Sequence, residues 1–148
     1  MEDLFLFLCN IFLLIILSGF FSSSETALTA VSEARIHELA LQGNKRAITI
    51  EKILAKKEKM ISTILIGNNL VNIVASVYAT SFSIIYFGEF DLIFVTILLT
   101  IVLVIFAEVI PKTYAFGHAD QVALGVAPII NFFIFILTPA TFITERFA

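Results

Sequence analysis

Four long apolar runs dominate this sequence and restrict what it can fold into. They extend from Leu4 to about Ser22, Ile61 to about Phe87, Leu92 to Ile110 and Val122 to Ile143. Each is close to the roughly 20 helical residues that cross the ~30 Å hydrocarbon core of a bilayer. The 148 residues are 59% hydrophobic and only 14% charged, and so short a chain cannot bury that much apolar surface in a soluble core. The sequence therefore predicts an all-α integral membrane protein.

Simple counts argue against several other interpretations. No basic residue precedes the first run and no small-residue cleavage pattern follows it, so we expect a span and not a cleaved signal peptide. The single Cys9 allows no intrachain disulfide. A net charge of −3 gives no reason to expect a nucleic acid as partner. The lipid bilayer is the partner that the composition predicts.

The segment between the first two runs is basic. Residues 31–60 hold seven of the nine Lys and Arg residues. Apolar residues recur in this segment at helical spacing on both sides of Gly43-Asn44, which is a turn signal. We interpret the segment as two short amphipathic helices at the membrane surface. A solvated, charged loop is the alternative.

The distribution of charge predicts how the chain crosses the membrane. Short loops rich in Lys and Arg stay cytoplasmic. The N-terminus and the connection between the second and third runs carry only acidic charges, whereas Lys112 follows the third run. Three transmembrane helices fit this pattern, with the N-terminus outside and residues 31–60 and the C-terminus cytoplasmic. Because the fourth run contains Pro128 and Pro139, we expect a Pro-bent juxtamembrane helix there in preference to a fourth span.

Polar residues inside a predicted span are costly in lipid and mark candidate functional sites. The first such stretch is Ser22-Ser23-Ser24-Glu25-Thr26, at the inner end of the first run. Serine hydroxyls compete for backbone hydrogen bonds and bend helices, and a bend would expose carbonyl oxygens to a cation. The alternative is an ordinary helix end, in which Ser or Thr caps the next helix and Glu25 lies in its first turn.

The second stretch is Gly67-Asn68-Asn69-Leu70-Val71-Asn72, inside the second run. Asn68 and Asn72 are four residues apart and therefore share a helix face. Gly67 would let another backbone approach closely. The amides either bind a cation or another substrate, or they join helices by hydrogen bonds, as Asn does in membrane proteins.

The third stretch is Ala107-Glu108-Val109-Ile110-Pro111-Lys112. Pro111 has no amide hydrogen, so the carbonyl of Ala107 loses its helical partner close to the Glu108 carboxylate. Alternatively, Glu108 reaches the cytoplasmic interface and pairs with Lys112. The three stretches together offer only oxygen ligands, which suit a hard cation such as Mg²⁺. The sequence contains no recognisable nucleophile–base pair or phosphate-binding loop, so we do not expect an enzyme.

These three motifs resemble the transmembrane domain of the CorC / cyclin M (CNNM) family of magnesium transporters. The matching stretches are Gly19 to Leu28, Gly67 to Ile73 and Glu108 to Lys112, and the resemblance covers nearly the whole of residues 1–148. It implies a homodimer in the plasma or inner membrane, with three spans, a pair of surface helices and a belt-like juxtamembrane helix in each protomer. It also implies export of a nearly dehydrated Mg²⁺ held between helices, with Na⁺ as the coupling ion.

By motif match, the resemblance implies a metal site formed by Ser22, Gly67 (through its carbonyl), Asn68, Asn72 and Glu108. Second choices are Ser23, Ser24, Glu25 and Asn69, the last because the family motif often carries Thr there. Family members continue into a cytoplasmic CBS-domain pair, so we expect a chain that stops at Ala148 to be a truncated or natural fragment. The rival hypothesis is a non-transporting membrane anchor or ion sensor, whose polar motifs serve helix packing and dimerisation.

Overall fold

The computed structural model describes residues 1–147, except for the side chains of Phe90, Thr141, Thr144 and Glu145. These residues form helices joined by short turns, and no strand occurs among them. The all-α prediction is therefore confirmed for the described chain. In order, the elements are α1 (Glu2–Ala30), α2 (Glu33–Leu41), α3 (Lys45–Ala55), α4 (Lys57–Phe87), the 3-10 helix η1 (Glu89–Asp91), α5 (Leu92–Val102), the π-helix η2 (Leu103–Val109), α6 (Ile110–Gly117) and α7 (Ala119–Phe147).

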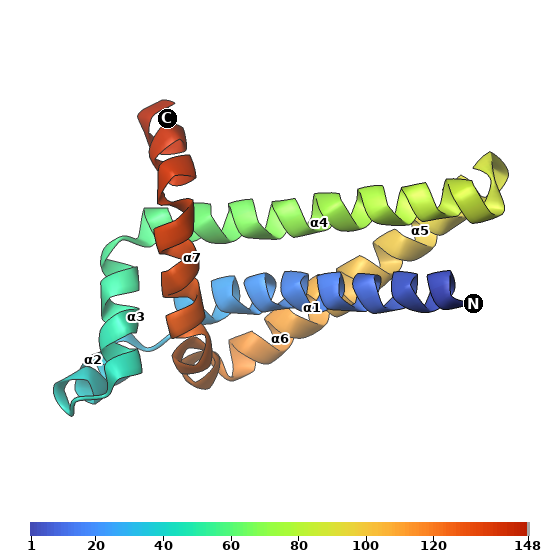
Figure 1. The fold of residues 1–148 in the computed structure, drawn as a ribbon. Helices are drawn as coiled ribbons and strands as arrows, with labels where there is room; N and C mark the ends of the chain where they lie inside the picture. Colours follow the sequence, from blue (N-terminus) through green and yellow to red (C-terminus); the bar gives the residue numbers. More distant parts are fainter. Residues whose placement is uncertain (148) are drawn as a thin grey trace.

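Four helical stretches among the described residues are long and apolar enough to cross a membrane. They are α1, α4, the continuous stretch Leu92–Gly117 formed by α5, η2 and α6 (the α5–α6 rod), and Ala119–Ala140 of α7. Figure 1 shows α1 and α4 side by side with the α5–α6 rod oblique to them, whereas most of α7 runs across their ends. By length and composition all four stretches could span a membrane. However, α7 runs crosswise to the other three.

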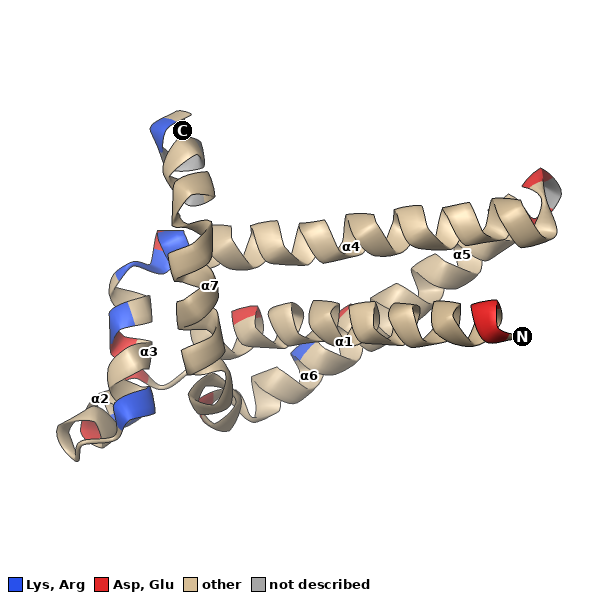
Figure 2. Cartoon of the chain, in the orientation of Figure 1, with Lys and Arg blue, Asp and Glu red and all other residues tan. Residues whose placement is uncertain are grey.

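The basic segment forms two short helices, α2 and α3, beside α7. Gly43 ends the first with a φ of 92°, a conformation that glycine adopts without strain. The Asn44 side chain then caps α3 by accepting hydrogen bonds from the backbone N–H groups of Arg46 and Ala47. Figure 2 shows basic residues gathered on α3 and at the start of α4, and acidic residues at the opposite end of α1 and α4. The end with α2 and α3 carries most of the basic residues, mixed with acidic ones, and is called the basic end below; the opposite end, with acidic residues only, is called the acidic end.

The buried core lies at the basic end. It joins the second half of α1 and the beginning of α4 to α2, α3, α6 and α7 through Phe21, Ala27, Leu28, Ile36, Ala47, Ile50, Ile53, Met60, Ile64, Ala115, Ala123, Ala127 and Ile130. Towards the acidic end, large apolar side chains point outward instead: Phe5 is 68% exposed and Ile85 is 75% exposed. Exposed apolar surface of this extent is stable against lipid or another apolar chain, not against water.

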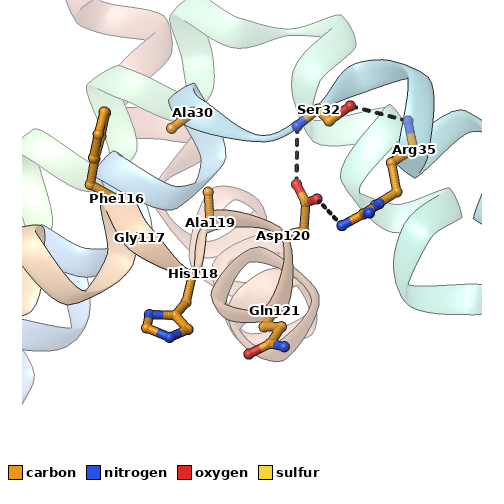
Figure 3. Close-up of a pocket in the computed structure, with 9 residues that line it drawn as sticks. All are labelled: Ala30, Ser32, Arg35, Phe116, Gly117, His118, Ala119, Asp120 and Gln121. Atoms are coloured by element: carbon orange, nitrogen blue, oxygen red, sulfur yellow. Dashed lines mark hydrogen bonds and ion pairs between the residues drawn. The ribbon is translucent and has the colours of Figure 1, made fainter.

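The Asp120 side chain links the turn after α1 to the start of α7 by hydrogen bonds. Its Oδ1 accepts a hydrogen bond from the Ser32 backbone N–H at 3.0 Å, and its Oδ2 accepts one from Arg35 Nη1 at 3.2 Å (Figure 3). Ser32 is also the N-cap of α2, because its hydroxyl accepts from the Arg35 N–H. One carboxylate therefore fixes the first turn of α2 relative to the first turn of α7. No sequence pattern predicted this role of Asp120.

The helix α1 packs antiparallel against α4 (Figure 1). Near the acidic end, the rings of Phe7 and Phe82 stack with centroids 3.9 Å apart, and Tyr86 donates a hydrogen bond to Asp3 at 2.9 Å. Aromatic and hydrogen-bonded contacts of this kind can hold membrane helices together where the lipid supplies no hydrophobic force.

Nearer the basic end, the ring of Phe21 covers Gly67. A Cβ atom on Gly67 would lie 2.7 Å from the ring carbons, closer than real carbon atoms approach. The expectation that Gly67 admits another backbone is therefore wrong, because an aromatic side chain occupies that space. Phe21 is itself 3% exposed and packs against Phe133 of α7, with ring centroids 5.2 Å apart.

We predict that Gly67→Ala destabilises the fold, because the added methyl group collides with a ring that has little room to move. The expected cost is about 1–3 kcal/mol, which would appear as a lower midpoint of thermal unfolding in detergent. Gly125→Ala is the matched control: no atom lies within 4 Å of its added Cβ, and Ala is favoured over Gly in helices by about 1 kcal/mol. Equal midpoints for the two variants would contradict the packing of Phe21 on Gly67.

Candidate functional site

A buried serine of α1 faces two asparagines of α4. Ser18 Oγ lies 3.0 Å from Asn68 Oδ1 and 2.9 Å from Asn72 Oδ1, and Ser18 is fully buried. A hydroxyl carries one proton, so it donates to only one of the two amide oxygens at a time. Three oxygen atoms from two helices therefore lie close together and share a single hydroxyl proton, so at least one amide oxygen lacks a donor from Ser18 at any moment. Such a cluster is suited to accept a further donor or a cation.

Ser22 lies one helical turn further along α1, on the same face as Ser18. It is fully buried, and its hydroxyl has no hydrogen-bond partner in the described part of the chain. A helical serine often donates to the carbonyl four residues earlier, as Ser24 does to Phe20 at 2.6 Å. A buried polar group without a partner costs about 1–3 kcal/mol. The Ser22 hydroxyl is thus a group that a ligand would stabilise.

The remaining residues of this motif belong to an unbroken helix. α1 continues through Ser22–Thr26 to Ala30, and Ser32 caps the next helix. The expectation of a helix end is therefore wrong, whereas a bend within the continuous helix stays a prediction. Ser23 and Ser24 donate to the Phe20 carbonyl within their own helix, so neither hydroxyl caps a new helix.

The other second-choice residues lie outside the Ser18–Asn68–Asn72 cluster. Asn69 is exposed, and Ser18 bonds to Asn68 and Asn72 instead. Glu25 is half-buried, and none of the hydrogen bonds or ion pairs between described residues involves its carboxylate. The structure therefore gives neither residue a place in the cluster.

Glu108 lies in η2, the π-helical segment that precedes Pro111. There the Ile110 N–H bonds to the carbonyl of Ile105, five residues earlier. Pro111 cannot donate to Ala107, and a π turn is one way in which a helix absorbs an interrupted ladder. The Glu108 side chain is half-buried. Within the described chain it forms no hydrogen bond or ion pair, so the considered pairing with Lys112 is absent.

The helix α1 lies between the two halves of the candidate site. Its Ser18 faces α4, whereas the neighbouring Gly19 faces the α5–α6 rod, where an added Cβ would lie 3.2 Å from Pro111 Cγ. The structure thus joins Asn68 and Asn72 through Ser18. Among the described residues, no hydrogen bond links Glu108 to this pair.

The charge at the site is correspondingly small. No group of three or more His, Cys, Asp or Glu side chains that could hold a metal ion occurs among the described residues. Any cation bound here would depend on neutral oxygens and on the single carboxylate of Glu108.

Ser18 is the residue of the site that the sequence analysis did not single out. Its signals were its position inside an apolar run and its spacing of four residues from Ser22.

Comparison with known proteins identifies a family. Residues 9–148 match the family described as "Cyclin M transmembrane N-terminal domain". A UPF0053 protein of Haemophilus influenzae is 39% identical over 133 residues, which are 90% of this chain and 32% of that protein. The UPF0053 inner membrane protein YfjD of Escherichia coli is 42% identical over 107 residues, covering 72% of this chain and 25% of that protein.

A more distant relative carries a functional name. The polyamine export protein of Haemophilus influenzae is 26% identical over 159 residues, which cover 99% of this chain and 37% of that protein. The chain therefore spans only about a third of the length of these curated relatives: 32% of the UPF0053 protein, 25% of YfjD and 37% of the polyamine export protein.

We predict that Ser18→Ala weakens the α1–α4 contact, because it removes the donor shared by the amide oxygens of Asn68 and Asn72. Hydrogen bonds between membrane helices contribute about 0.6–1.7 kcal/mol, so the unfolding midpoint in detergent should fall measurably. Ser83→Ala is the matched control, since Ser83 is buried like Ser18 (1% exposed) but its hydroxyl has no hydrogen-bond partner among the described residues. If Ser83→Ala lowered the midpoint as much as Ser18→Ala, the bridging role of Ser18 would be contradicted.

Proposed function

We propose that this chain, which belongs to the cyclin M transmembrane-domain family, transports Mg²⁺ across the membrane. Family membership supports the transporter class. The observation that carries the proposal is the buried, unpartnered hydroxyl of Ser22 one turn from the Ser18–Asn68–Asn72 cluster. The Ser22 hydroxyl takes no part in the hydrogen bonds by which Ser18 joins α1 to α4. In a membrane such groups are costly and mark ion or substrate pathways.

The proposed ligands are all oxygens. Mg²⁺ requires about six oxygens at roughly 2.0–2.1 Å and loses its water reluctantly. The Ser22 hydroxyl and the amides of Asn68 and Asn72 replace part of the water shell, and the Gly67 carbonyl adds a further ligand. Ser18 holds the two amides in place while the site is empty.

Glu108 supplies the negative charge in this proposal. A single carboxylate does not fully compensate a divalent ion, which favours release as well as binding. The π-helical register around Glu108 supports a role in movement, because π segments occur frequently at functional sites. Movement of the α5–α6 rod against α1 would bring Glu108 to the cargo from one side of the membrane. Na⁺ entry is the proposed driving force for export.

We place α1, α4 and the α5–α6 rod across the bilayer and α7 along its cytoplasmic face. The crosswise direction of α7 supports this arrangement (Figure 1). The separation of charge in Figure 2 supports an outside N-terminus and a cytoplasmic basic end. The apolar surface that remains exposed on the spans is available to lipid and to a second copy in a homodimer. A cytoplasmic CBS-domain pair would follow α7 in the complete protein.

A polyamine is the second candidate cargo, because one relative is named a polyamine export protein. A polyamine presents ammonium groups along a flexible chain, and each group donates hydrogen bonds to oxygens. It would use the same amide oxygens and Glu108 but would not need a compact shell of ligands around one atom. The two cargoes therefore differ in how strongly transport depends on the Ser22 hydroxyl.

We expect Glu108→Gln and Ser22→Ala to reduce Mg²⁺ efflux from loaded vesicles at least tenfold. Since the Ser22 hydroxyl makes no hydrogen bond within the described chain, its removal should leave the unfolding midpoint unchanged or raised. Ser83→Ala, which removes an equally buried and unpartnered hydroxyl outside the cluster, should transport normally. Spermidine efflux is measured in the same vesicles.

Three results would count against the proposal. Undiminished Mg²⁺ efflux by Glu108→Gln would remove this carboxylate from the cargo site. Spermidine efflux without Mg²⁺ efflux by the unaltered protein would favour the polyamine. Transport of neither cargo would support the non-transporting anchor.

A further inference from the structure

A basic cavity lies where the end of α3, the start of α4 and the middle of α7 meet. It has a volume of about 380 Å³ and is lined by Lys52, Lys56 and Lys59 together with Ile53 of α3 and with Asn131 and Ile134 of α7. None of its lining residues is acidic. The cavity therefore combines three positive charges and an amide with an apolar wall.

The three lysines have no counterion among the described residues. The ion pairs there are Arg35 with Asp120 and His37 with Glu51, and neither reaches the cavity. Glu58 lines a neighbouring hollow together with Lys56, Lys57 and Lys59, but among the described residues it forms no ion pair with any of them. Like charges gathered around one space repel one another, so an anion bound between them would relieve that repulsion.

The position of the cavity identifies the source of the anion. Lys59 is the last charged residue before the apolar part of α4, since residues 60–87 contain no Lys, Arg, Asp or Glu. The cavity is thus level with the point where α4 becomes apolar, which is where lipid headgroups lie. Beside it, α7 exposes Phe132 (58%) and Phe135 (79%). An anion held in the cavity would have apolar surface next to it for hydrocarbon chains.

We propose that this cavity binds the phosphate of an anionic phospholipid headgroup. The lysine ammonium groups and the Asn131 amide donate hydrogen bonds to the phosphate oxygens, and Ile53 and Ile134 contact the adjoining carbons of the lipid. Basic pockets at the cytoplasmic ends of membrane helices bind such headgroups. The lipid fastens the α3–α4 junction and α7 to the same leaflet. This binding is independent of the transported cargo.

The test uses the purified protein in detergent and measures binding of phosphatidylglycerol, phosphatidylcholine and inorganic phosphate by native mass spectrometry. The variant Lys52→Gln/Lys56→Gln removes two exposed lysines of the cavity. The control Lys45→Gln/Lys57→Gln removes the same charge from two exposed lysines that do not line it. Because all four side chains are exposed, both variants should fold, and the unfolding midpoint checks this.

We expect the cavity variant to bind phosphatidylglycerol about 25-fold more weakly, a factor of about five per lysine, equivalent to about 1 kcal/mol each. The control should change by less than twofold, and phosphatidylcholine should bind weakly to every form. Equal losses in the two variants would overturn the proposal in favour of general attraction to a basic surface. Binding of inorganic phosphate as tight as that of the lipid would also overturn it, because the site would then be one for free anions.

Discussion

The antiparallel contact between α1 and α4 holds two of the membrane helices together and also positions the polar side chains of the candidate site. In hydrocarbon, each helix satisfies its own backbone, and helices associate through close packing and side-chain hydrogen bonds. Phe21 over Gly67 supplies the close packing, and Ser18 between Asn68 and Asn72 supplies the hydrogen bond. The same contact that joins the helices also collects the oxygens of the candidate ion site.

This overlap bears on whether the polar motifs serve packing or ion binding. Ser18 gives both asparagines a role in packing even when no ion is present. Ser22, buried on the same helix face without a partner in the described chain, has no such role. A helix pair built only for packing would be more stable with an apolar residue there. The polarity of Ser22, more than that of the asparagines, therefore favours a ligand.

The helix α7 is held at the basic end by polar and apolar contacts. Asp120 links its first turn to Ser32 and Arg35, and its alanines pack into the core. The lipid that we propose for the cavity beside Asn131 would add a third attachment. Since α1 ends in the same region, the position of α7 and the packing of the inner half of α1 depend on one another.

Features that depend on local spacing could be predicted from the amino-acid sequence. Long apolar runs required helices, Gly43-Asn44 separated α2 from α3, and the spacing of Asn68 and Asn72 put both on one helix face. Other features became visible only in the packed helices: Ser18 joins the two asparagines, Phe21 covers Gly67, α1 continues past its serines, and α7 runs across the bundle. These features depend on which helix faces which, and Ser18 and Asn72 are 54 residues apart. Hydrophobic periodicity indicates which side of a helix is polar. It does not indicate which residue of another helix packs against that side.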